Sequence, residues 1–76
     1  MRRFPRAQRA VAAVLAEARR KAGLSTRALS AKLRADHNYI ARIESLERHV
    51  SAAEFMAIAR ALGVRPSTLM ARAEKR

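Results

Sequence analysis

The sequence predicts an all-α fold, a single domain of five short helices. Half of the residues are apolar, and many of these are Ala, which is a strong helix former. Gly and Pro number only two each, and β-branched and aromatic residues are sparse. A chain of 76 residues buries only about 60% of its unfolded surface. We therefore expect a compact domain with a small core.

The charge of the chain points to an anionic partner. Seventeen Lys and Arg stand against six Asp and Glu, which gives a formal charge of +11. Fourteen of the seventeen are Arg, whose planar fork suits phosphate and guanine. Such an excess of positive charge attracts polyanions. Composition thus favours nucleic acid, although it does not separate DNA from RNA or from an acidic membrane surface.

Other functional classes are disfavoured. The absence of cysteine removes disulfides, thiolate nucleophiles and cysteine-ligated metals. The acidic residues and the two histidines show neither paired-carboxylate nor metal-ligand spacing, so we expect no enzyme activity, metal or cofactor. No apolar run approaches the roughly 18 residues that span a bilayer, and the first residues lack the apolar stretch of a secretory signal. We expect a cytoplasmic, nucleoid-associated protein that does not contact a membrane.

The first two helices follow from apolar spacing and capping residues. Residues 6–22 repeat apolar side chains at intervals of three and four, and Gly23 can end this helix in a left-handed conformation. Ser25 is a suitable N-cap for a second helix, which ends near Leu33. The side chains expected to face the core are Val11, Val14, Leu15, Ala18, Ala22, Leu24, Leu29 and Leu33.

The third helix is predicted to follow after a very short turn. Asp36 is a good N-cap, and we expect the helix to span residues 37–45 with Ile40 and Ile43 facing inward. Only three residues separate Leu33 from His37. Two short helices joined by so brief a connection are typical of the helix-turn-helix motif.

The rest of the chain predicts two more helices. Ser51 and Glu54 have the spacing of a capping box, so a fourth helix is expected over residues 52–62, with Gly63 closing it. Pro66 opens a short fifth helix. The domain is expected to span residues 6–73, preceded by a basic arm over residues 1–5 and followed by a frayed tail over residues 74–76.

The order of these features resembles the phage Cro and cI repressor family, the XRE-type helix-turn-helix proteins. The resemblance runs from about residue 15 to residue 70. It rests on Arg19, the Gly23-Leu24-Ser25 turn, Leu29, Leu33, Ile40, Glu44 and the ending Ala59-Arg60-Ala61-Leu62-Gly63-Val64. It implies a five-helix, lambda-repressor-like domain that regulates transcription by binding double-stranded DNA.

The resemblance also implies a structural salt bridge between Arg19 and Glu44. In this family an Arg of the first helix pairs with a Glu at the end of the DNA-reading helix. Losing one partner of such a pair leaves an uncompensated charge, which is costly. The alternative, a contact from Glu44 to cytosine, is disfavoured because Glu44 lies one turn beyond Ile40 on the inward side.

Three residues depart from the family pattern. Arg34 and Leu46 stand where the family usually has Gly, and Ser30 replaces a small Ala inside the motif. Arg34 therefore either adopts an unfavourable left-handed conformation or the turn takes another shape.

The outward side of the third helix is expected to read bases. Asn can bridge adenine N6 and N7, Arg can fork onto guanine, and Ala can touch a thymine methyl group. For His37, the first residue of this helix, a surface position or a phosphate contact is an equal alternative. The predicted base-reading residues are His37, Asn38, Ala41 and Arg42.

A second group is expected to contact the DNA backbone. The N-terminus of a helix favours binding of phosphate, which suits Thr26, although helix initiation explains Thr26 equally well. For Tyr39, the alternative to a phosphate contact is a half-buried position in the core. The predicted phosphate contacts are Thr26, Arg27, Arg34, Tyr39, Arg48 and His49. A basic arm that enters a minor groove is assigned to Arg2, Arg3 and Arg6.

A homodimer is expected, because one reading helix covers too few base pairs for useful selectivity. The predicted dimer surface comprises Leu62, Val64, Leu69, Met70 and Ala73, with closure of the domain core as the alternative for Leu69. The favoured function is a repressor of phage or mobile-element type that reads a pseudo-palindromic site. The alternatives are an antitoxin or small interaction module with the same fold, and RNA or nucleoid binding through charge alone.

Overall fold

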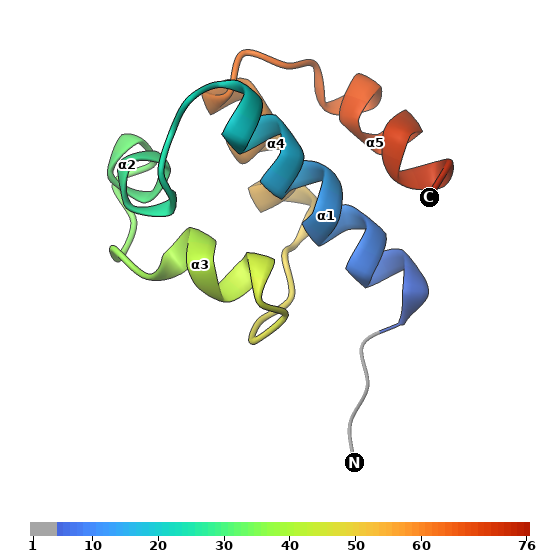
Figure 1. The fold of residues 1–76 in the computed structure, drawn as a ribbon, viewed down its shortest axis with the longest axis horizontal. Coiled ribbons are helices and arrows are strands. Elements are labelled where there is room, and N and C mark those ends of the chain that lie inside the picture. Colours follow the sequence, from blue (N-terminus) through green and yellow to red (C-terminus); the bar gives the residue numbers. More distant parts are fainter. Residues whose placement is uncertain (1–4) are drawn as a thin grey trace.

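A computed structural model describes residues 5–76 and shows an all-helical domain without strands in that range (Figure 1). The predicted fold class is therefore confirmed. Figure 1 shows α1 crossing the centre of the fold, with α3 on one side of it and α5 on the other. The helices are α1 (Arg6–Lys21), α2 (Thr26–Lys32), α3 (Tyr39–Glu44), α4 (Ala52–Ala61) and α5 (Pro66–Glu74). None of these helices is long and apolar enough to cross a membrane.

Every helix contributes to one small core. Of the side chains predicted to face the core, Val14, Leu15, Ala18, Leu29, Ile40 and Ile43 are buried. Val11, Leu24 and Leu33 are only partly buried. Ala22 is exposed, because it caps α1 instead of continuing its apolar stripe. The buried cluster comprises Val14, Leu15, Ala18, Leu29, Ile40, Ile43, Phe55, Ile58, Ala59, Leu69 and Ala73.

Two predicted N-caps are confirmed by their hydrogen bonds. The hydroxyl of Ser25 accepts from the backbone N–H of Ala28 at 3.0 Å. At α4, the Ser51 hydroxyl accepts from the N–H of Glu54 at 3.1 Å, and the Glu54 carboxylate accepts from the N–H of Ser51 at 2.9 Å. These bonds satisfy N–H groups that the first turn of a helix otherwise leaves unpaired.

The first four helices all end in the same backbone motif. In each, a left-handed residue follows the C-cap, and the N–H of the residue after it bonds back to a carbonyl five positions earlier. Gly23 and Gly63 occupy the left-handed position after α1 and α4, each with φ of 75°. The corresponding bonds run from the N–H groups of Leu24 and Val64 to the carbonyls of Arg19 and Ala59.

Arg34 and Leu46 occupy the same position after α2 and α3. Their φ angles are 58° and 65°, so both adopt the left-handed conformation that glycine tolerates best. The N–H of Ala35 bonds to the Ser30 carbonyl at 2.9 Å, and that of Glu47 bonds to the Arg42 carbonyl at 2.8 Å. The family turn is thus kept, at the cost of backbone strain in both residues.

The start of α3 differs from the prediction of a helix over residues 37–45. The regular helix begins at Tyr39 and ends at Glu44, because His37 and Asn38 form a turn closed by a bond from the Tyr39 N–H to the Asp36 carbonyl. The Asp36 carboxylate instead caps this turn and accepts from the N–H of Asn38 at 2.8 Å.

The C-terminal residues, predicted to form a frayed tail, contact α1. Glu74 is the last residue of α5, and the guanidinium of Arg76 donates to the Glu17 carboxylate at 2.6 Å. The C-terminal residues are thus tied to α1 by an exposed ion pair.

Replacing Arg34 with Gly should stabilise the domain. A left-handed φ costs a non-glycine residue about 1–2 kcal/mol, part of which the greater unfolded-state freedom of Gly offsets. We expect Arg34→Gly to raise the free energy of unfolding by about 0.5–1 kcal/mol in urea denaturation. The control Lys32→Gly, inside α2, should lower it by about 1 kcal/mol. Destabilisation by both variants would contradict the strain assigned to Arg34.

Candidate nucleic-acid interface

A two-pronged ion pair fixes α3 on α1. The Nε of Arg19 donates to one Glu44 carboxylate oxygen at 2.6 Å, and its Nη2 donates to the other at 3.0 Å. The two side chains are only 13% and 14% exposed. The pair that the family resemblance implies is therefore present, with both carboxylate oxygens engaged.

Arg19 also holds the turn that leads into α2. Its Nη1 donates to the backbone carbonyl of Leu24 at 2.8 Å. The hydrogen bond with Glu44 raises the pKa of Arg19, against the opposing effect of burial. One permanently charged side chain thus joins α1, the α1–α2 turn and the end of α3.

Ser30 forms a second polar link, between α2 and α3. Its side chain is fully buried, and its hydroxyl donates to the Thr26 carbonyl at 2.9 Å. The same hydroxyl accepts from the backbone N–H of Ile40 at 3.1 Å. Ile40 lies in the first turn of α3, where the helix offers no partner for that N–H. The sequence marked Ser30 only as a departure from the family.

The turn before α3 carries local charge. Asp36 has a lowered pKa, mainly because its carboxylate accepts a hydrogen bond from the Asn38 backbone, with smaller contributions from His37 and Arg42. The Nδ1 of His37 lies 4.0 Å from this carboxylate. Asp36 therefore stays ionised at neutral pH and holds the turn that presents His37 and Asn38.

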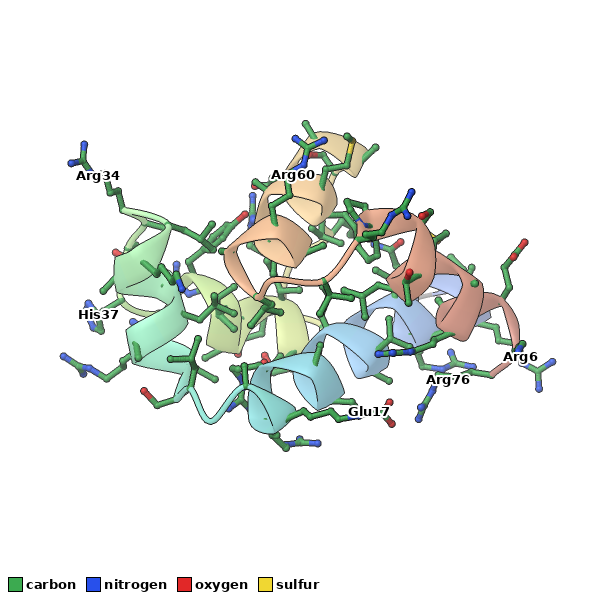
Figure 2. All side chains as sticks on the ribbon, turned by 90° about the horizontal axis from the view of Figure 1, so that it is seen from above. Arg6, Glu17, Arg34, His37, Arg60 and Arg76 are labelled. Carbon is green, nitrogen blue, oxygen red and sulfur yellow. The ribbon has the colours of Figure 1, made fainter. Side chains whose placement is uncertain are left out.

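The predicted base-reading residues lie on the outer side of α3 and its preceding turn. His37, Asn38 and Arg42 are exposed, and Ala41 is partly buried. In Figure 2 the side chains of His37 and Arg34 project from the same end of the molecule. Arg42 makes no salt bridge within residues 5–76.

Tyr39 and Arg48 are engaged inside the domain. The Arg48 guanidinium carbon lies 5.0 Å from the centre of the Tyr39 ring, and its Nη1 donates to Glu54 at 3.0 Å. Burial is the main cause that raises the pKa of Tyr39. A phosphate would have to compete with Glu54 for Arg48, whose bond attaches the loop after α3 to α4.

The other predicted phosphate contacts differ in their surroundings. Arg27 and Arg34 are exposed, whereas Thr26 is partly buried at the first position of α2. His49 is exposed but lies 2.8 Å from the side-chain nitrogen of Gln8 in a hydrogen bond to α1. Arg27 and Arg34 thus have the most accessible charges of this group.

The arm prediction needs correction at Arg6. Arg6 is the first residue of α1 and not part of an extended arm, because the helix starts directly after Pro5. Figure 2 shows Arg6 at the opposite end of the molecule from His37 and Arg34. Arg2 and Arg3 lie outside the described residues.

The dimer surface is also corrected in part. Leu69 is 0% exposed and Ala73 is 8% exposed, so both pack in the core of the domain and offer no surface to a second copy. Leu62 and Val64 are partly buried, while Met70 is 41% exposed. Met56 on α4, at 40%, is an exposed large apolar residue that the sequence analysis did not single out.

These features define the class of protein: a helix-turn-helix domain, with α2 and α3 as the motif. Comparison with protein families gives the same result, because the helix-turn-helix family model matches residues 15–69. The chain belongs to the XRE-type helix-turn-helix family, a family of DNA-binding transcription regulators.

Two solved structures are similar to this chain. An XRE-family-like protein from Pseudomonas syringae pv. tomato is 33% identical, with a TM-score of 0.82 over 92% of this chain and 84% of that one. The clp gene regulator ClgR from C. glutamicum is 24% identical, with a TM-score of 0.84 over 95% of this chain and 94% of that one, and shows the shared fold. Among curated proteins, none matches this chain significantly.

Ser30 provides a direct test of how α3 is held. Ser30→Ala leaves the buried Ile40 N–H without its acceptor, which should lower the free energy of unfolding by about 1–2 kcal/mol in urea denaturation. Hydrogen exchange at the Ile40 amide should become faster. The control Ser67→Ala, at an exposed position of α5, should change stability by less than about 0.5 kcal/mol. Unchanged stability and Ile40 exchange in Ser30→Ala would contradict the role of the hydroxyl.

Proposed function

We propose that this domain reads a specific double-stranded DNA sequence by placing α3 and its preceding turn in the major groove. The observation that carries this proposal is the exposure of His37, Asn38 and Arg42 on an element that buried and polar contacts hold in place. The formal charge of +11 supplies the attraction to phosphate that precedes base reading.

The anchoring of α3 supports sequence reading over binding through charge alone. Ile40 and Ile43 bury the inner side of the helix, while Ser30 holds its start and Arg19 its end. Base recognition needs side chains fixed to within a fraction of an ångström, which a supported helix provides. Binding by charge alone would place no such demand on the helix.

The exposed side chains have the chemistry of base readers. Arg42 can fork onto guanine O6 and N7, and Asn38 can bridge adenine N6 and N7. Since Arg42 has no salt-bridge partner among residues 5–76, no ion pair has to break before it contacts a base. His37 extends the same exposed surface. Ala41 is partly buried, so this residue could make only a close apolar contact with a base.

Phosphate contacts would fix the domain on the duplex. Arg27 and Arg34 are exposed on the motif itself, Arg27 on α2 and Arg34 on the turn before α3. Such contacts set position and orientation without reading sequence.

We further propose that two copies occupy a pseudo-palindromic site and repress transcription. One reading helix samples too few base pairs for selectivity, and a second copy one helical turn away supplies the rest. Exposed Met70 on α5 is the remaining predicted residue with substantial free apolar surface for this pairing. A protein that occupies a promoter blocks transcription directly. Repression in the manner of phage regulators therefore needs no additional surface for binding another protein.

Selection of bound duplexes from a random pool tests the proposal. The selected sites should contain two inverted half-sites. Arg42→Ala should weaken binding to the selected duplex about 10- to 100-fold and leave binding to random duplex nearly unchanged, because it removes a base contact. Arg27→Ala should weaken both by similar factors, because it removes a phosphate contact.

The matched control is Arg60→Ala, which removes one exposed charge on α4, away from His37 and Arg34 in Figure 2. It should affect neither duplex by more than about twofold. Equal losses on both duplexes for Arg42→Ala would reject base reading by α3, and isolated single half-sites would reject the paired arrangement.

A further inference from the structure

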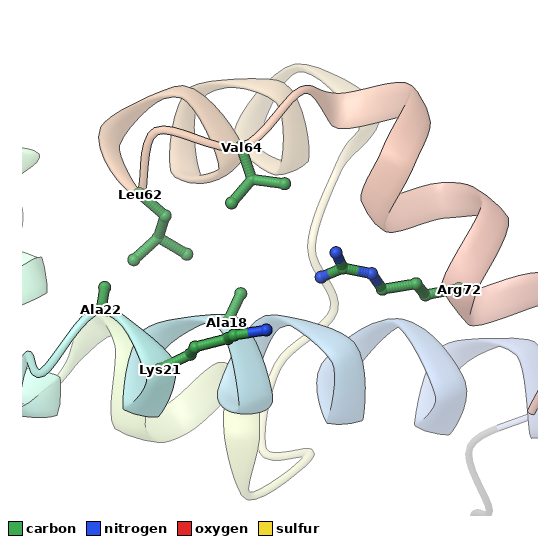
Figure 3. A pocket seen from close by; sticks show the side chains of 6 residues that line it. All are labelled: Ala18, Lys21, Ala22, Leu62, Val64 and Arg72. Atoms are coloured by element: carbon green, nitrogen blue, oxygen red, sulfur yellow. The ribbon is translucent and has the colours of Figure 1, made fainter.

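A pocket of about 260 Å³ lies between α1 and the chain that connects α4 to α5. Figure 3 shows it opening above the last turns of α1, with Arg72 reaching toward it from α5. The residues that line it are Ala18, Lys21, Ala22, Leu62, Val64 and Arg72.

The walls of the pocket are aliphatic. Ala18 is buried at its base, and Leu62 and Val64 are only partly buried, so the core does not use all of their apolar surface. The motif that ends α4 places both side chains here, since Leu62 is the C-cap and Val64 follows the left-handed Gly63. The pocket therefore offers a short apolar chain a surface to contact.

Two cations lie at the pocket from different helices. Lys21 is at the end of α1 and Arg72 is on α5. Neither makes a salt bridge with an acidic side chain of residues 5–76, although Arg19, Arg48 and Arg76 all do. An anion between Lys21 and Arg72 would offset their mutual repulsion, and the planar fork of Arg72 suits a carboxylate.

The pocket is separated from the DNA-reading element. In Figure 3, α3 lies beneath α1 while the pocket opens above it. A ligand in the pocket would therefore not occupy the space in front of α3.

We propose that this pocket binds a small organic acid, a carboxylate carried on a short aliphatic chain. The carboxylate lies between Lys21 and Arg72, and the chain packs on Leu62 and Val64. The volume is below the roughly 300–1,000 Å³ of sites for drug-sized ligands, which favours a short acid. A second copy of this chain fits poorly, because a two-fold contact centred here would bring the same cations together.

Methyl NMR of the full chain with hexanoate as the probe tests this proposal. The methyl signals of Ala18, Ala22, Leu62 and Val64 should shift with a saturable, millimolar Kd. Acetate, which lacks the chain, and 1-hexanol, which lacks the charge, should each bind at least about tenfold more weakly. Arg72→Gln and Lys21→Gln should each weaken hexanoate binding about fivefold to tenfold.

The matched control is Arg65→Gln, which removes an exposed charge at the N-cap of α5 without altering the pocket lining. It should leave the Kd for hexanoate within about twofold. Using both cation variants keeps the test valid if one of them perturbs α1 or α5. Shifts scattered over the whole surface, equal binding of 1-hexanol, or equal losses in Arg65→Gln would overturn the proposal.

Discussion

The ion pair between Arg19 and Glu44 is the contact on which the orientation of α3 depends. Both carboxylate oxygens accept from the guanidinium, and the same guanidinium also binds the Leu24 carbonyl. A pair this enclosed contributes little net stability, because desolvation offsets much of its attraction, but breaking it leaves a nearly buried charge. Its main effect is therefore to select one orientation of α3 on α1. The direction of the exposed side chains on α3 follows from that orientation.

The two sides of α1 contact different parts of the domain. On one side, Glu44 and the buried isoleucines attach α3, whose outer residues are free to meet DNA. On the other side, α1 meets α5 and the end of α4, where the core leaves an aliphatic pocket beside Lys21 and Arg72. A ligand in that pocket would touch α1, which supports α3, without covering the outer side of α3 that we propose reads DNA. The two proposed binding sites therefore lie on different sides of α1.

The sequence predicted most of the fold because its signals are local. Ser25 and the Ser51–Glu54 box lie within three residues of the N–H groups they satisfy, and Gly23 and Gly63 sit where φ is positive. Arg34 and Leu46 adopt the same conformation although their residue types do not favour it, and only the family resemblance marked these positions. The cap signal of Asp36 is equally compatible with a turn, which is why α3 was placed two residues too early.

Contacts between distant residues were harder to predict from the sequence. Ser30 binds a backbone N–H ten positions away, so its role depends on how α2 packs on α3. Helical periodicity shows that Leu69 and Ala73 face inward, but it does not show whether the apolar neighbour is the domain's own core or a second copy. The link between Arg19 and Glu44 came from family resemblance, because a spacing of 25 residues carries no pairing signal of its own.

A double-mutant cycle on this pair tests the account most directly. Arg19→Met, Glu44→Gln and the double variant would be compared by urea denaturation and by affinity for a selected duplex. We expect a coupling energy of about 1–3 kcal/mol in stability, with each single variant also binding the duplex more weakly than the parent chain. Additive stability effects, together with unchanged DNA affinity in both single variants, would contradict the claim that this pair orients the reading helix.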